Sequence, residues 1–142
     1  MIYLDTSVLG ALFFREPGAA DLARRLESQR KERLTISAWT LTEMASVGGI
    51  KERTGAIDSL TRQQALANFQ RFASMKLETV EIEPADFRTA AVLIESPAAL
   101  RSGDALHLAV ARRLGARLAT LDNGLHTAAS SLGFAIFALS PE

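Results

Sequence analysis

Four acidic residues in this sequence occupy positions from which they can act together. Asp5 and Asp122 each end a short apolar run, and Asp104 lies near the start of an apolar helical segment. Glu43 lies on a largely apolar helical strip, where a solvated acid is uncommon. No Lys or Arg lies within four residues of Asp5, Glu43 or Asp122, and a partly buried carboxylate is costly unless it is paired or binds a metal. Together the four acids predict a cation site.

The chemistry of such a site follows from its ligands. Carboxylate oxygens without any cysteine favour Mg²⁺ or Mn²⁺ over zinc or copper. Such an ion polarises a phosphodiester and lowers the pKa of a water molecule that it binds. We therefore expect a metal-dependent hydrolase in which Asp5, Asp104 and Asp122 bind the ion directly or through water. Glu43 is expected to bind the ion through a water molecule or to position the attacking water, with a share in general-base catalysis.

Each acid also has a local structural interpretation. Asp5 can cap the helix that follows it, and Asp104 can be a first-turn acid that interacts with the helix dipole. Asp122 precedes Asn123 and Gly124, and this tripeptide is typical of a turn. Because each signal is weak by itself, the prediction depends on the order and spacing of all four acids.

The composition limits the alternatives. A chain of 142 residues predicts one domain, residues 1–142. Sixteen basic and sixteen acidic residues give no net charge, so any binding to nucleic acid must come from a local patch. The absence of cysteine excludes disulfides and thiolate zinc sites. The apolar N-terminus lacks a basic region before it, and no run of eighteen apolar residues occurs, so we expect a cytoplasmic protein without membrane contact.

Alternating short apolar runs and helical stretches must position these acids. The runs predict strands at 2–5, 34–37, 79–82, 117–121 and 134–139. Helical spacing and breakers predict helices at 6–14, 17–31, 37–55, 59–73, 84–95, 102–114 and 123–132, with Thr6 or Ser7 capping the first and Gly48–Gly49 weakening the third. This alternation predicts an α/β fold with a parallel sheet of about five strands, in the order 3-2-1-4-5, and helices on both faces. Asp5 and Asp122 would then meet where the strand order reverses.

The ordered motifs resemble those of one family. They are Tyr-Leu-Asp-Thr-Ser-Val-Leu at 3–9, Ser-Ala-Trp-Thr-Leu-Thr-Glu-Met at 37–44, Gly-Asp-Ala-Leu-His-Leu-Ala-Val-Ala at 103–111, Leu-Ala-Thr-Leu-Asp at 118–122, and the apolar ending at 132–139. Across essentially the whole chain, this set resembles PIN domains, specifically stand-alone VapC-type toxins of toxin–antitoxin pairs.

The resemblance implies a function and a set of residues. It implies Mg²⁺- or Mn²⁺-dependent cleavage of RNA, a homodimer, and a VapB-type antitoxin that blocks the site. The acidic site falls on Asp5, Glu43, Asp104 and Asp122, with Ser7 and Thr120 as supporting hydroxyls. Many relatives carry a further acid and an aromatic residue just after the last Asp, where this chain has Gly124 and Leu125. The number of metal ions, one or two, stays open.

Other polar residues receive simpler interpretations. We interpret His107 as a helical histidine packed beside leucines, His126 as a surface residue and Asp86 as a first-turn acid. Trp39 is interpreted as core or interface. Arg15, after the first short helix, is our candidate for a phosphate contact.

Two other classes of function remain as alternatives. One is another Mg²⁺-dependent phosphoryl hydrolase, either a DNA nuclease or an aspartyl phosphatase. An aspartyl phosphatase needs a second acid two residues after its nucleophile, where this chain has Ser7. The other is a non-enzymatic module, either a receiver-like switch or a catalytically degenerate PIN scaffold. A receiver needs a lysine after its last strands, and the last lysine here is Lys76.

Overall fold

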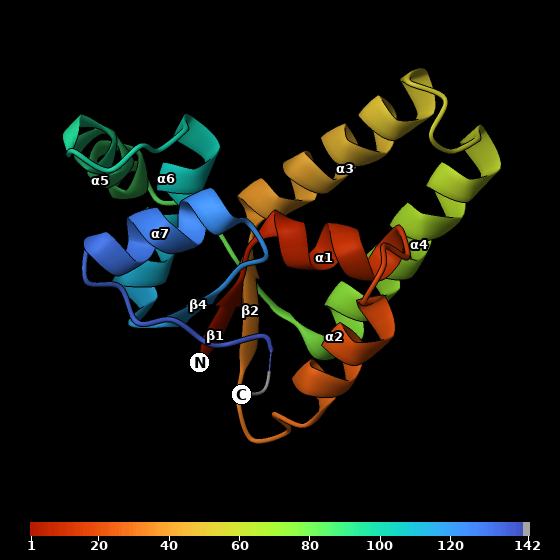
Figure 1. The fold of residues 1–142 in the computed structure, drawn as a ribbon, viewed down its shortest axis with the longest axis horizontal. Coiled ribbons are helices and arrows are strands. Elements are labelled where there is room, and N and C mark those ends of the chain that lie inside the picture. Colours follow the sequence, from red (N-terminus) through yellow and green to blue (C-terminus); the bar gives the residue numbers. More distant parts are fainter. Residues whose placement is uncertain (141–142) are drawn as a thin grey trace.

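A parallel sheet forms the centre of the computed structural model, which describes residues 1–140 (Figure 1). Its four strands are β1 (Ile2–Leu4), β2 (Leu34–Ser37), β3 (Glu78–Val80) and β4 (Arg117–Ala119), in the order β3-β2-β1-β4. Ile2 pairs with Leu34 on one side and with Arg117 on the other, so β1 lies between β2 and β4. The predicted parallel sheet and the order 3-2-1-4 are confirmed.

The predicted fifth strand at 134–139 is wrong in extent. Only a single parallel bridge joins Ile136 to Leu118, supported by two backbone hydrogen bonds. Leu118 donates to the Ala135 carbonyl at 2.9 Å, and Phe137 donates to the Leu118 carbonyl at 2.8 Å. Since β4 is only three residues long, its outer edge offers few backbone groups to a further strand. The segment nevertheless lies beside β4, on the side where the fifth strand was expected.

Seven helices cover the sheet within the described residues. They are α1 (Thr6–Phe13), α2 (Ala19–Glu27), α3 (Ala38–Arg53), α4 (Ser59–Lys76), α5 (Pro84–Glu95), α6 (Ser102–Leu114) and α7 (Asn123–Ser131). Figure 1 shows α5, α6 and α7 on one side of the sheet and α1, α2 and α4 on the other, with α3 beginning at the strand ends. Among residues 1–140, no helix combines the length and apolarity needed to cross a bilayer.

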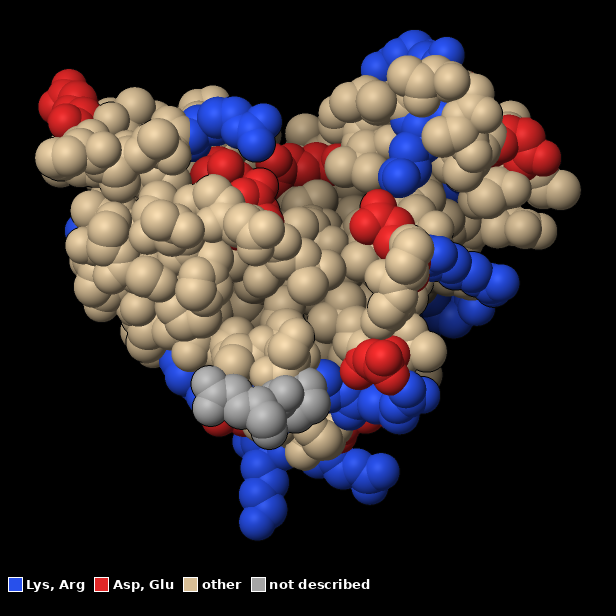
Figure 2. Space-filling model, in the orientation of Figure 1, with Lys and Arg blue, Asp and Glu red and all other residues tan. Residues whose placement is uncertain are grey.

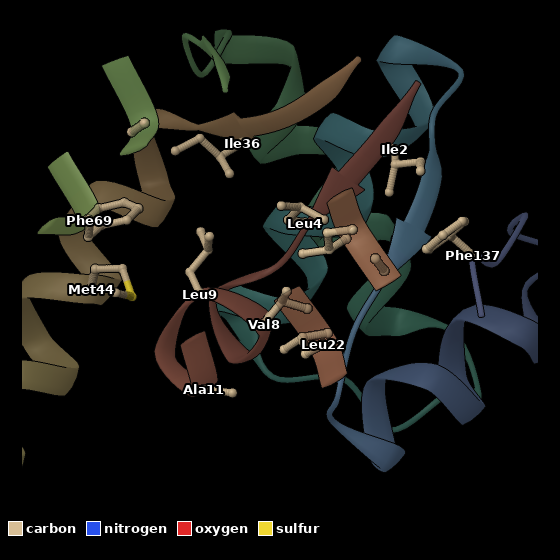
Figure 3. Packing of buried hydrophobic residues seen from close by; sticks show 13 residues of the cluster. Ile2, Leu4, Val8, Leu9, Ala11, Leu22, Ile36, Met44, Phe69 and Phe137 are labelled. Carbon is tan, nitrogen blue, oxygen red and sulfur yellow. The ribbon is translucent and has the colours of Figure 1, made fainter. Parts of the chain in front are cut away.

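Successive side chains of β1 point to opposite faces of the sheet, and a separate hydrophobic cluster lies on each face. Ile2 and Leu4 face the cluster formed with α1, α2, α3 and α4, in which Leu9, Met44 and Phe69 are buried (Figure 3). Tyr3 faces the opposite cluster, which α5, α6 and α7 complete. The central strand is therefore buried on both faces, as its continuous apolar run predicted.

The third helix continues through both glycines that were expected to weaken it. A Cβ atom on Gly48 would lie 3.2 Å from Cγ of Arg62 and 3.4 Å from side-chain atoms of Leu66 and Phe14. A side chain there would make tight contacts with these side chains. Gly48 therefore allows the two helices to pack closely, and this packing outweighs its low helix propensity.

Candidate active site

The four predicted acids line one cavity at the carboxyl ends of β1, β2 and β4. The cavity has a volume of about 690 Å³. Asp5 and Asp122 directly follow β1 and β4, Asp104 lies in the first turn of α6, and Glu43 comes from the second turn of α3. Figure 2 shows acidic atoms in a hollow between the block of α5, α6 and α7 and the pair of α3 and α4. Residues distant in sequence thus converge on one concave surface.

Asp5 forms the buried base of this cavity. Its side chain is 3% exposed, and both carboxylate oxygens accept hydrogen bonds. Ser7 Oγ donates to Oδ1 and Thr120 Oγ1 donates to Oδ2, each at 2.5 Å. Burial raises the pKa of Asp5, although the hydrogen bonds from Ser7 and Thr120 act in the opposite direction. The two hydroxyls that the sequence indicated as supporting residues therefore both hold the same carboxylate.

The local interpretation of Asp5 as a helix cap is correct, whereas Asp122 begins a helix rather than a turn. Asp5, rather than Thr6 or Ser7, is the N-cap of α1, and its Oδ1 accepts from the backbone N–H of Val8 at 3.4 Å. Asp122 is the N-cap of α7, and its Oδ1 accepts from the backbone N–H of Leu125 at 2.9 Å. A cap uses one carboxylate oxygen, so the same side chain can still present charge to the cavity.

Asp104 and Asp122 share one exposed basic neighbour, Arg101. Its guanidinium nitrogens lie 3.9 Å from Oδ2 of Asp104 and 3.9 Å from Oδ2 of Asp122. Burial raises the pKa of Asp104, and so do the negative charges of Asp122 and Asp5, whereas Arg101 opposes the shift. The cavity therefore carries negative charge that its own side chains do not fully compensate.

Glu43 is held by a hydroxyl and by an imidazole. Thr6 Oγ1 donates to Glu43 Oε1 at 2.6 Å, and His107 Nε2 makes a short contact with the same oxygen. Burial alone would raise the pKa of Glu43, but the hydrogen bond and charge of His107, together with Thr6, lower it. Glu43 is therefore held in its ionised form.

The interpretation of His107 as a helical histidine packed beside leucines is correct but incomplete. The ring is 1% exposed, and it touches Glu43, Thr6 and Tyr3 through its nitrogens. The only sequence signal was its position one helical turn after Asp104, on the side of α6 that faces the cavity. Thr6, which contacts Glu43, was also missed as a site residue.

Arg15, predicted as a phosphate contact near the site, does not line the cavity. Its backbone is left-handed, with φ of 52°, in the turn after α1, where the side chain is exposed. Arg101 is the basic residue that lines the cavity instead. The signal for it was its position three residues before Asp104, which places the two side chains on one side of the α6 N-terminus.

The remaining interpretations of polar residues mostly hold. Asp86 is a first-turn acid of α5 and lies outside the cavity, where it is buried against Arg113. His126 is exposed on α7. Trp39 packs against the second hydrophobic cluster but also lines the cavity.

The donor set fits a hydrated hard cation. Within residues 1–140, no three acidic or histidine side chains are placed close enough together to hold a metal ion by direct contact. Mg²⁺-like ions retain several water molecules and bind through one or two carboxylates, so an open ring of acids suits them. Burial raises the pKa of Asp104, and so does repulsion from Asp122 and Asp5, which a bound cation would relieve. Asp5, Asp104 and Asp122 are the residues available to hold it.

The chain is similar to known proteins over nearly its whole length. The family model described as PIN domain matches residues 2–130. Ribonuclease VapC46 of Mycobacterium tuberculosis is 31% identical over 142 residues, covering 98% of each chain. Ribonuclease VapC35 of the same species is 35% identical over 145 residues, covering 97% of this chain and 96% of the relative.

Solved structures share the fold at lower identity. VapC20 of Mycobacterium tuberculosis, described as a sarcin-ricin loop cleaving toxin, superposes with a TM-score of 0.69 at 19% identity, covering 96% of this chain and 98% of that one. The structure of VapBC-1 from nontypeable Haemophilus influenzae gives a TM-score of 0.68 at 18% identity, covering 99% and 100%. At these identities the likeness extends to the fold alone.

Proposed function

The chain belongs to the PIN domain family, in its VapC ribonuclease group, and from this premise we propose that it is an endoribonuclease and the toxin of a toxin–antitoxin pair. One observation carries the proposal: four acids from four separate segments line a single cavity whose charge one exposed arginine only partly offsets. Two relatives that match nearly the full chain are named ribonucleases, which supports RNA as the substrate.

Each acid has a distinct part in the proposed reaction. Asp5, Asp104 and Asp122 hold a divalent cation, Mg²⁺ or Mn²⁺, directly or through water. When bound, such an ion polarises the scissile phosphate and makes water a better nucleophile. Glu43 is ionised at neutral pH because its pKa is lowered, so its carboxylate orients the attacking water by accepting a hydrogen bond from it and takes a share in general-base catalysis. Ser7 and Thr120 keep the Asp5 carboxylate in place.

Arg101 is the basic group available to the substrate. Its side chain is exposed and lies beside Asp104 and Asp122 at the cavity. Its ion pairs with these aspartates are long and solvated, so they are weak enough to exchange for a phosphate. A guanidinium matches a phosphate with two parallel N–H donors, which favours Arg101 as a substrate-positioning group.

The alternatives fit the cavity less well. An aspartyl phosphatase would need a second acid two residues after Asp5, where this chain has Ser7, whose hydroxyl donates to the Asp5 carboxylate. A catalytically degenerate scaffold would have lost part of the acidic set, whereas this chain retains all four acids around one cavity.

The proposed partners are a VapB-type antitoxin and a second copy of the chain. Structural neighbours include VapBC-1 of Haemophilus influenzae and VapBC2 of Rickettsia felis bound to a promoter DNA fragment. Large apolar side chains are exposed on α3, α4 and α5, namely Leu41, Ile50, Leu60, Met75, Phe87, Val92 and Ile94. Such surfaces often mark protein interfaces. Light scattering at micromolar concentration should give a dimer mass, and a monomer mass throughout would contradict the homodimer.

A cleavage assay with matched variants tests the enzymatic proposal. The purified protein should cleave RNA with Mg²⁺ or Mn²⁺ and lose this activity in EDTA. Glu43→Gln should abolish most cleavage, whereas Glu95→Gln, the same change at an exposed acid outside the cavity, should leave it unchanged. Full cleavage in chelator would exclude the metal mechanism, and equal behaviour of the two variants would exclude the role of Glu43.

A further inference from the structure

A buried chain of polar contacts leads from the sheet to Glu43. Tyr3 Oη lies 2.9 Å from Ser37 Oγ and 2.6 Å from Nδ1 of His107. His107 Nε2 in turn contacts Oε1 of Glu43. These contacts therefore connect β1, β2, α6 and α3, and the last of them reaches the Glu43 carboxylate, which lines the cavity.

Packing alone does not require a histidine at this position. The residues around His107 on α6 are buried and apolar, from Ala105 to Ala111. A buried polar ring is costly unless its nitrogens find partners, and here both do. A leucine would fill the space without that requirement. The identity of the side chain is therefore explained by its contacts rather than by its volume.

The charge of the Glu43 carboxylate determines which partner donates the hydrogen bond between His107 and Glu43. An ionised carboxylate only accepts, so Nε2 must carry the hydrogen that points to Glu43 Oε1. Nδ1 is engaged by Tyr3, whose hydroxyl stays protonated because burial raises its pKa. With both nitrogens engaged and the ring 1% exposed, His107 has no free lone pair to bind a metal or substrate.

The two carboxylate oxygens of Glu43 have different contacts. Oε1 accepts from both Thr6 and His107. Within residues 1–140, no hydrogen bond reaches Oε2, and this oxygen lies near Gly103, which also lines the cavity. Fixing one oxygen of a planar carboxylate limits its rotation, so the other oxygen stays available to the cavity.

We propose that His107 is a positioning residue for the reaction, which, supported by Tyr3 and Ser37, holds Glu43 so that Oε2 faces the reacting water. The inference rests on the proposed ribonuclease function for its effect on rate. It assigns a role in that function to a side chain that touches neither the phosphate nor a cation.

Steady-state cleavage of RNA by three variants tests the effect on rate. Loss of a hydrogen bond that orients a catalytic or metal-binding side chain typically costs about 10–100-fold, and we expect His107→Leu to lower kcat by this factor with KM within about twofold. His107→Gln should recover most of kcat, because its amide N–H can donate to Glu43. His126→Leu, at the other histidine of the chain, is the matched control and should keep the wild-type kcat. Wild-type kcat in His107→Leu, or an equal loss in the leucine and glutamine variants, would overturn the proposal.

Nuclear magnetic resonance of ¹⁵N-histidine-labelled protein in EDTA provides a readout without catalysis. Because the chain has two histidines and His126 is exposed, a slowly exchanging imidazole N–H should come from His107 alone. The signal should vanish in His107→Gln, persist in His126→Leu and exchange faster in Glu43→Ala. Absence of any protected imidazole N–H in the wild type would overturn the proposal. A protected signal in a protein that cleaves no RNA would instead overturn the proposed function.

Discussion

Removing the charge of Asp104 should stabilise the protein when no metal is present. This side chain shares the cavity with Asp5 and Asp122, and burial and their negative charges raise its pKa. An acid with a raised pKa in the folded state opposes folding once it is ionised. Asp104→Asn keeps the shape and hydrogen-bonding capacity of the side chain but deletes this charge. In EDTA at pH 7, the variant should therefore unfold at a higher temperature than the wild type.

The expected magnitude follows from opposing contributions. Two unit charges 4 Å apart interact by about 4 kcal/mol at an effective dielectric of 20, but solvent screening reduces exposed pairs to about 0–1 kcal/mol. Arg101 lies 3.9 Å from Asp104 and is 86% exposed, so it offsets only part of the repulsion. Loss of the favourable helix-start position of Asp104 costs about 0.3–1 kcal/mol. We expect a net gain of about 1 kcal/mol, worth roughly 2–8 °C in domains of similar size.

The effect of Asp104→Asn on the melting temperature should depend on pH. Below about pH 3.9, the ordinary value for Asp, the side chain is protonated in both states and contributes no penalty. As pH rises above that value, the unfolded state loses its proton first, so the penalty on folding grows until the folded state is also ionised. The difference in melting temperature between variant and wild type should therefore be small near pH 3 and largest at neutral pH.

Thermal melts followed by circular dichroism, in EDTA and with added Mn²⁺, measure these effects. Mn²⁺ should stabilise the wild type by mass action and the variant much less. Glu95→Gln removes an exposed acid outside the cavity, so it should leave the melting temperature unchanged both in EDTA and with Mn²⁺. If Asp104→Asn melts below the wild type at pH 7 in EDTA, Asp104 is a structural helix-start residue and the reasoning from repulsion is wrong.

Three further perturbations have distinct expected results. In Gly103→Ala, the new Cβ would lie 3.1 Å from Glu43 Oε2 and 3.3 Å from Nε1 of Trp39. Steady-state assays should therefore show a lower kcat, and the melting temperature should be level with or below that of the wild type; an unchanged kcat would contradict the close contact. Arg113→Met leaves the buried carboxylate of Asp86 unpaired, which should cost about 3–5 kcal/mol in urea unfolding without changing kcat of the folded protein. Burial alone would raise the pKa of Asp86, but hydrogen bonds from Arg113 and Glu83 overcome it and lower this pKa. The stabilisation that the Asp86–Arg113 pair gives to the folded protein is therefore present above about pH 3.9, the ordinary Asp pKa, and should be lost as pH falls through the lower pKa of Asp86 in the folded state. Arg101→Met should raise KM for RNA and weaken the salt dependence of binding by about one phosphate contact, measured by titration at several salt concentrations.

Local sequence patterns determined where the strands, most helices and the candidate acids lie. The buried run Ile2–Leu4 and the acid that follows it are adjacent in the chain, so the end of a strand and the cap of a helix could be predicted together. The same is true of β4 and Asp122. Because parallel strands joined by helices end at the same edge of the sheet, this local information also predicted that the two acids would meet.

The tertiary structure alone decided which polar side chains support the acids and where the sheet ends. His107 contacts Glu43, which is 64 residues away in the sequence, and Tyr3, which is 104 residues away. The apolar neighbours of His107 on α6 gave no sign of either contact. The segment 134–139 has the apolar character of a strand, but the short edge of β4 limits it to one bridge. A hydrogen bond or a strand pair requires two partners in register, and only the packing of distant elements brings both into range.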